Sequence, residues 1–125
     1  MSSSQTPRPF GYFVEKRKDN SKKKMEQNRQ KTLFKLKKVL LELSKQIEFK
    51  EVIFFGSLTQ QYRFADNSDI DIAFRGLSNA DYFSTIAFIS NRLKRDIDVI
   101  QLETQCRFKE KIIKTGIKWQ KPELL

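Results

Sequence analysis

The sequence predicts an α/β or α+β sandwich, in which helices flank one central sheet. The first observation is a set of apolar residues that step by three and four, and therefore line one face of a helix running from about Ser21 to Ile47: Leu33, Leu36, Leu40, Leu43 and Ile47. The second is the run EVIFF at 51–55, which is β-branched and aromatic, stops at Gly56 and predicts a buried strand. The third is the alternating run DIDIAF at 69–74, which predicts another strand.

The remaining elements follow in order along the chain. Ser78 and Asp81 have the spacing of a capping box, and apolar residues at helical steps follow, so a helix is expected from about Asn79 to Arg95. The run DIDVIQ at 96–101 predicts a third strand, and a helix is expected over 103–115, ending before Gly116. A short extended piece at 117–119 closes the fold. The lysine run at 22–24 would begin the first helix, where positive charge opposes the helix dipole, so its first turn is expected to fray.

The length of the chain indicates one domain, and the distribution of charge indicates a basic amino-terminal part. The 125 residues suit a single domain over 21–125, while the serines and prolines of residues 1–20 predict a flexible segment. The net charge is +10, and residues 1–50 hold 14 basic and 5 acidic residues of the total. Such a segment attracts phosphate backbones or an acidic protein partner. For the lysine run itself, a solvated helix face is the commoner explanation and nucleic-acid contact is the other.

Several classes of chemistry are excluded by composition. The chain has no histidine, which excludes Ser-His-Asp catalysis, a histidine general base and histidine-ligated zinc. Cys106 is the single cysteine, so no internal disulfide forms. No apolar run approaches the ~20 residues that cross a bilayer, and no secretory signal is present, so a cytoplasmic protein without membrane association is expected. Carboxylates are left as the main acid, base and metal-binding groups.

Three aspartates form the candidate metal site. Asp69 and Asp71 project from the same face of one predicted strand with their side-chain bases about 7 Å apart. Asp98 lies in a strand that can pair beside it, and the three carboxylates would suit a pair of magnesium ions. Asp96 shares the face of Asp98 on a regular strand, so residue spacing alone leaves both as the third ligand.

A glycine-serine pair follows the first strand. Gly56 allows a sharp turn and a close approach of the backbone to a ligand. Backbone N–H groups after it, together with the Ser57 hydroxyl, would suit the phosphates of a nucleotide. Taken alone, an ordinary turn is the better interpretation of these two residues.

The combined motifs resemble a known family. FFGS at 54–57, SDIDIAF at 68–74 and the later strand with Asp98 resemble the nucleotidyltransferase superfamily that shares its core with DNA polymerase β. Among its branches the chain looks most like the minimal nucleotidyltransferases, and the tail EKIIKTGIKW is similar to the end of such proteins. The resemblance covers roughly Leu33 to Gln120. It implies a polymerase β palm-like fold, with a small central mixed sheet flanked by helices.

The resemblance also implies a reaction and a partner. Gly56 and Ser57 would bind the triphosphate of ATP, the substrate. Asp69 and Asp71 would bind two Mg²⁺ ions, and Asp98 would bind one of them and help deprotonate the incoming hydroxyl. The family match to DVI favours Asp98 over Asp96. Small members are commonly paired with a HEPN-domain ribonuclease toxin, and some act as antitoxins by transferring AMP to a toxin tyrosine.

The chain departs from the family pattern after Ser57. Residues 58–68 separate the serine from Asp69, one more than is usual, and LTQQYRF replaces the usual glycine-containing run. A loop absorbs one extra residue at little cost. The departure motivates a second hypothesis, a weak or inactive nucleotidyltransferase-fold module that neutralises its partner sterically. A third hypothesis is an RNA-directed nucleotidyltransferase that uses the basic amino-terminal segment.

Overall fold

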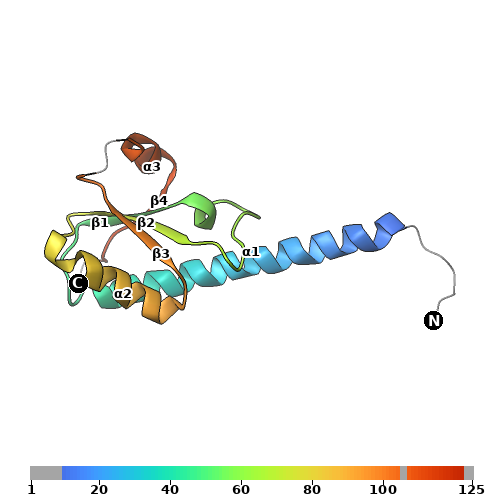
Figure 1. The fold of residues 1–125 in the computed structure, drawn as a ribbon, viewed down its shortest axis with the longest axis horizontal. Coiled ribbons are helices and arrows are strands. Elements are labelled where there is room, and N and C mark those ends of the chain that lie inside the picture. Colours follow the sequence, from blue (N-terminus) through green and yellow to red (C-terminus); the bar gives the residue numbers. More distant parts are fainter. Residues whose placement is uncertain (1–9, 105–106, 123–125) are drawn as a thin grey trace.

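A four-stranded mixed sheet forms the centre of the molecule. The computed structural model describes residues 10–104 and 107–122. The strands are β1 (Glu51–Phe55), β2 (Ile70–Arg75), β3 (Ile97–Gln101) and β4 (Ile117–Trp119), in the order β3-β2-β1-β4 (Figure 1). β1 is antiparallel to β2 and β4, whereas β2 and β3 are parallel. The helices are α1 (Phe10–Leu43), α2 (Tyr82–Leu93) and α3 (Lys109–Thr115). The predicted sandwich with a mixed central sheet is confirmed.

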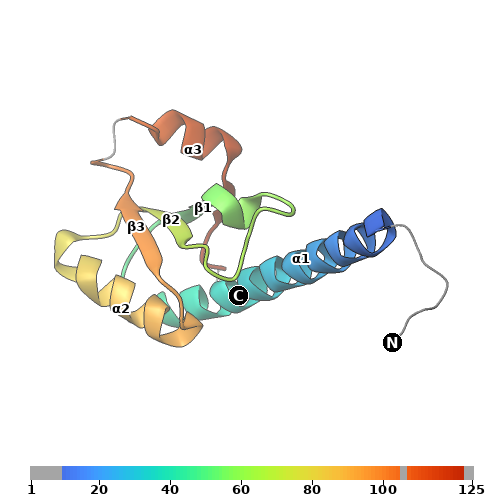
Figure 2. The same cartoon turned by 45° about the vertical axis from the view of Figure 1, so that its right-hand side comes forward.

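The two faces of the sheet are covered by different helices. α1 and α2 lie against one face and α3 lies against the other (Figures 1 and 2). The alternation of side chains along β2 explains this division, because Ile70, Ile72 and Phe74 are buried in the larger core with residues of α1 and α2. Ala73 is buried in the smaller core with Ile53, Leu102 and Ile112. Asp71, two residues before Ala73, therefore lies on the α3 face.

α1 is longer than the sequence predicted. It begins at Phe10 rather than near Ser21 and ends at Leu43, before Ile47. Residues 10–43 contain one glycine and no proline, and they are rich in lysine and leucine, which favour helix. The expectation of a frayed first turn at Lys22 is wrong, since this residue lies within the helix. Residues 1–9 of the predicted flexible segment lie outside the described residues.

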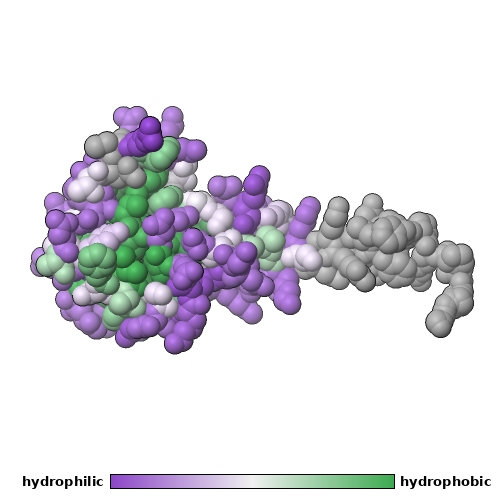
Figure 3. Space-filling view, in the orientation of Figure 1, coloured by the Kyte–Doolittle hydropathy of each residue, from purple (hydrophilic) through white to green (hydrophobic). Residues whose placement is uncertain are grey.

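α1 extends well beyond the sheet. Its 34 residues give a length of about 50 Å at 1.5 Å per residue, and the amino-terminal half projects from the compact part (Figure 2). Hydrophilic residues cover it where it leaves the compact part (Figure 3). The carboxyl-terminal half holds the helix in place through Leu36, Leu40 and Leu43, which are fully buried and contribute about 1.5–3 kcal/mol each. Across the described residues, no helix combines the length and apolar character needed to span a membrane.

The ends of α2 are fixed by local hydrogen bonds. Ser78 Oγ accepts from the Asp81 N–H at 3.3 Å and donates to the Asp81 carboxylate at 3.0 Å, so Ser78 is a cap as predicted, but of the 3₁₀ turn that precedes α2. A 3₁₀ turn at Asn79–Asp81 precedes the helix, and Lys94 ends it in the left-handed conformation, with φ 56°. The Arg95 guanidinium then donates to the carbonyls of three residues that precede β2: Ala65, Asp66 and Ser68. The end of α2 thereby fixes the segment that leads into Asp69.

Gly116 joins α3 to β4 at a point of close packing. The helix predicted over 103–115 is formed only at Lys109–Thr115, and residues 105 and 106 lie outside the described residues. Gly116 has φ −78°, so the left-handed conformation expected at a helix end is not used. Instead, a Cβ there would collide with the Ile53 side chain and lie 2.8 Å from the Phe54 carbonyl oxygen. Glycine is required because the end of α3 approaches β1 closely.

Gly116→Ala is expected to destabilise the fold. The added methyl must displace either Ile53 or the β1 backbone, and overpacking of this kind costs about 1–3 kcal/mol. Urea unfolding followed by circular dichroism measures the change. Ala87→Gly, on an exposed position of α2, is a control that alters backbone freedom without a collision and should cost about 1 kcal/mol or less. An unchanged midpoint for Gly116→Ala would contradict the close approach.

Candidate active site

Asp71 and Asp98 face each other across two neighbouring strands. The parallel register of β2 and β3 pairs Asp71 with Asp98 directly. Neighbouring strands lie about 4.8 Å apart, and paired residues project from the same face. Both carboxylates therefore lie on the α3 face of the sheet. The structure brings together two of the three aspartates predicted from the sequence.

Asp69 and Asp96 lie just outside the strands. The predicted strand at 69–74 begins at Ile70 and that at 96–101 begins at Ile97, so both aspartates precede their strands and are exposed. They share a cavity of about 320 Å³ that Lys94 and Arg95 also line. Asp98 instead lines a different cavity, together with Gly56. The two candidates for the third ligand are thus separated, and only Asp98 is paired with Asp71.

The charge around Asp71 is uncompensated. Burial first, and then the charges of Asp98 and Asp69, raise the pKa of Asp71 from 3.8 to about 6. None of these causes is a basic side chain, so the three carboxylates repel one another without a counter-charge at Asp71. Hard carboxylate oxygens gathered in this way fit a divalent cation such as Mg²⁺.

The side chains of Asp69, Asp71 and Asp98 do not converge on a single point. Among residues 10–104 and 107–122, no three acidic or cysteine side chains are grouped closely enough to enclose a single ion. The facing pair Asp71 and Asp98 is the centre of the site, and Asp69 lies at its rim. The side chains that could hold a divalent cation are therefore those of Asp71 and Asp98, together with that of Asp69 at the rim.

The turn after β1 lies against this acidic pair. Gly56 has φ +74°, a conformation that glycine adopts without strain, and it opens a 3₁₀ turn at Gly56–Thr59 that contains Ser57. Phe55 pairs with Asp71 in the sheet, which brings the turn beside that carboxylate. A Cβ at Gly56 would collide with the Asp71 carboxylate and lie 3.1 Å from its Cγ. Gly56 is therefore required both by its backbone conformation and by this contact.

A cavity of about 500 Å³ opens from the turn toward α3. It is lined by Gly56 and Asp98 on the sheet side, and by Phe108 and Lys111 on the α3 side. Phe108 falls within the helix expected over 103–115, and neither Phe108 nor Lys111 was predicted as a site residue. Phe108 is 56% exposed and Lys111 is also exposed, so both are available to a ligand. Their signal was the helical spacing of Phe108, Lys111 and Thr115, which face the cavity together.

Comparisons with known proteins identify the fold and the family. Residues 23–119 match the family described as Polymerase beta, Nucleotidyltransferase, whereas no curated protein matches the chain. A mutant of the toxin-antitoxin MntA-HpeT is similar in structure, with a TM-score of 0.55 and 22% identity, over 67% of this chain and 72% of that chain. A toxin-antitoxin with AMP-PNP has a TM-score of 0.55 and 24% identity, over 67% and 71% of the two chains. These likenesses concern the fold. Because the family match spans more than three quarters of the sequence, the chain belongs to the polymerase beta nucleotidyltransferase family.

Proposed function

We propose that this nucleotidyltransferase-family protein transfers AMP from ATP to a tyrosine of a HEPN-domain ribonuclease toxin, and that it acts in the cytoplasm as the antitoxin. The observation that carries the enzymatic part is the facing pair Asp71 and Asp98 beside the Gly56 turn. The partner is supported by the likeness of fold to toxin-antitoxin structures, one of which is described as containing AMP-PNP. The same likeness supports ATP as the nucleotide.

The acidic residues have distinct roles in the proposed reaction. Asp71 and Asp69 would hold the two Mg²⁺ ions, and Asp98 would hold one of them. When bound, the ions supply Lewis-acid stabilisation of the phosphate oxygens. Asp98 also accepts the proton of the attacking tyrosine hydroxyl, whose oxygen forms a bond to the α-phosphorus of ATP. The bond from that phosphorus to the bridging oxygen breaks, and pyrophosphate leaves.

Other residues position the nucleotide. The backbone N–H groups that follow Gly56 and the Ser57 hydroxyl contact the β- and γ-phosphates. Lys111 brings a positive charge to the same cavity, and Phe108 offers an aromatic ring to the base. The cavity of about 500 Å³ is within the range of sites that bind small molecules and cofactors.

The function is tested with a purified partner. The HEPN protein is incubated with this chain, ATP and Mg²⁺, and its intact mass is measured. The mass is expected to increase by one or more AMP groups, with the modification on a tyrosine, and chelation of Mg²⁺ should abolish the change. An unmodified partner that a related enzyme can still modify would overturn the proposal.

A second candidate function is steric neutralisation without chemistry. It is favoured by the altered loop after Ser57, in which Tyr62 has φ 63°, an uncommon conformation for a bulky residue. Neutralisation of the partner is measured in cells with Asp69 and Asp71 both replaced by asparagine. Full neutralisation by this variant would show that binding is sufficient.

A third candidate is transfer to RNA, for which the exposed lysines Lys22, Lys23 and Lys24 of α1 supply phosphate contacts. Such binding must weaken steeply as salt is added, because contacts with phosphates release counterions. RNA binding that is insensitive to salt would exclude a role for these lysines as phosphate contacts.

A further inference from the structure

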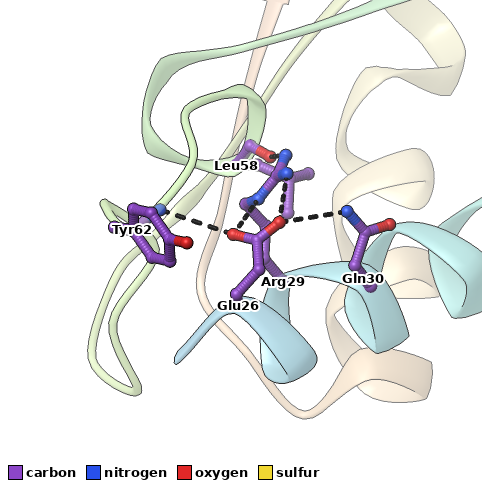
Figure 4. A network of polar contacts seen from close by, with 5 residues as sticks. All are labelled: Glu26, Arg29, Gln30, Leu58 and Tyr62. Atoms are coloured by element: carbon purple, nitrogen blue, oxygen red, sulfur yellow. Dashed lines mark hydrogen bonds and ion pairs between the residues drawn. The ribbon is translucent and has the colours of Figure 1, made fainter. Parts of the chain in front are cut away.

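α1 is hydrogen-bonded to the loop that follows Ser57 (Figure 4). The Glu26 carboxylate accepts from Arg29 Nη2 at 2.6 Å and Nε at 3.0 Å, and from Gln30 Nε2 at 3.1 Å. It also accepts from the backbone N–H of Tyr62 at 3.4 Å. Arg29 Nη1 donates to the backbone carbonyl of Leu58 at 3.2 Å. Two residues of one helix thus contact the loop backbone at two points.

These contacts fall on the segment that departs from the family pattern. Leu58 directly follows Ser57, and its side chain is fully buried, so the Arg29 bond to its carbonyl fixes the start of the loop. Tyr62 adopts φ 63° in a run that contains no glycine. A non-glycine residue in this conformation is strained and persists when surrounding contacts hold it. The hydrogen bond from the Tyr62 N–H to the Glu26 carboxylate is one such contact. Asn28 Nδ2 of α1 also donates to the Asp66 carboxylate, further along the segment between β1 and β2, at 2.9 Å.

The Glu26–Arg29 pair is stable in its charged form. The hydrogen bond from Arg29 lowers the pKa of Glu26 to about 2, and the hydrogen bond to Glu26 raises the pKa of Arg29. The two side chains are 19% and 11% exposed, respectively, so solvent reaches them only in part. Charge-assisted hydrogen bonds of this kind are shorter and stronger than neutral ones. The pair therefore stays charged near neutral pH, and through it α1 contacts the loop backbone at Leu58 and Tyr62.

We propose that Glu26 and Arg29 are positioning residues for nucleotide binding, and that α1 holds the Ser57–Tyr62 loop, with Tyr62 in the left-handed region, in the conformation that binds the triphosphate. The inference rests on the proposed function, because it assumes that the loop binds the triphosphate. Neither residue lines the cavity that contains Gly56 and Asp98, so each acts through the backbone of Leu58 or Tyr62.

The test compares two loop-contact variants with a matched control. Glu26→Gln and Arg29→Gln weaken the anchor. Glu42→Gln breaks another ion pair of α1, at 3.3 Å to Arg92 of α2, away from the loop. Amide hydrogen exchange at 57–62 without nucleotide is expected to be faster in the first two variants and unchanged in the control. The KM for ATP is expected to rise about tenfold, as for the loss of one charged hydrogen bond, with a smaller change in kcat. Arg29→Lys, which keeps one donor, should restore part of the loss.

Each outcome decides a separate point. Unchanged loop exchange and KM in folded Glu26→Gln and Arg29→Gln would overturn the positioning role. Faster exchange throughout the sheet, rather than at 57–62, would show a general loss of stability and would also overturn it. If the unaltered protein does not bind ATP, the proposed function fails, and the exchange comparison then decides alone whether α1 orders the loop.

Discussion

Asp71→Asn is expected to abolish AMP transfer while making the metal-free protein more stable. Asparagine keeps the shape of the Asp71 side chain but removes its negative charge, which faces the carboxylate of Asp98. Loss of a residue that only orients a metal ligand costs about 10- to 100-fold in activity, so loss of a ligand itself should exceed about 100-fold. The stability gain arises because the Asp71 carboxylate is partly buried and, to a smaller extent, because it is repelled by Asp98 and Asp69.

The stability gain has a defined pH dependence. The pKa of Asp71 is raised from 3.8 to about 6 in the folded state, so the folded protein binds this proton more tightly than the unfolded chain does. The charged carboxylate therefore destabilises the fold fully above about pH 6, and the penalty disappears as the pH falls toward 3.8. A shift of two units corresponds to about 3 kcal/mol, and partial exposure reduces this to about 1–2 kcal/mol. Asp71→Asn should show this gain at about pH 7 and little of it near pH 4.

Urea unfolding at both pH values, in the presence of a chelator, measures the gain. Glu110→Gln removes an exposed acidic charge from α3 and is the control, with an expected change within about 0.5 kcal/mol. Added Mg²⁺ should stabilise the unaltered protein and have no effect on Asp71→Asn. A variant that still transfers AMP, or that is less stable than the unaltered protein at about pH 7, would contradict the assignment.

The strands were predictable because their signals are local. The run EVIFF at 51–55 forms β1 with the predicted bounds, and the alternation at 69–74 placed Ile70 and Ile72 in the core opposite Asp71. The start of α1 was not predictable from apolar periodicity. Its amino-terminal half projects from the sheet, so the apolar spacing of the residues that pack on the sheet gives no signal for where the helix begins.

The site was predictable in its residues but only partly in its geometry. Asp71 and Gly56 follow from strand alternation and from the motif, yet their contact depends on the pairing of Phe55 with Asp71. Such register joins residues distant in sequence and is fixed by the whole sheet. The Glu26 contact with Tyr62 spans 36 residues and carries no local signal. Lys111 was missed because a lysine on a short helix is ordinarily a solvated residue.

Asp98 and Asp96 are the two candidates for the third acidic residue of the site, and replacing each by asparagine is expected to change the transfer rate very differently. Asp98→Asn is expected to reduce kcat by more than about 100-fold, because it removes both a proposed metal ligand and the proposed proton acceptor for the attacking hydroxyl. Asp96→Asn should leave kcat within about twofold, since this exposed side chain lies before β3 in the other cavity. The backbone carbonyl of Asp96, which accepts from the Ile70 N–H at 3.1 Å, is kept in the variant.

The two variants form a matched pair, because each exchanges one aspartate for asparagine within a span of three residues. Measuring the transfer rate together with the Asp71 pKa by NMR separates a chemical role from a structural one. Asp98→Asn should lower the pKa of Asp71 from about 6, since of the two neighbouring carboxylates Asp98 raises this pKa more, whereas Asp96 is not among the causes of that shift. If Asp96→Asn instead removed activity and Asp98→Asn retained it, the pairing of β2 with β3 would not be the source of the metal site, and the chemistry would have to lie in the cavity that Asp69 and Asp96 share.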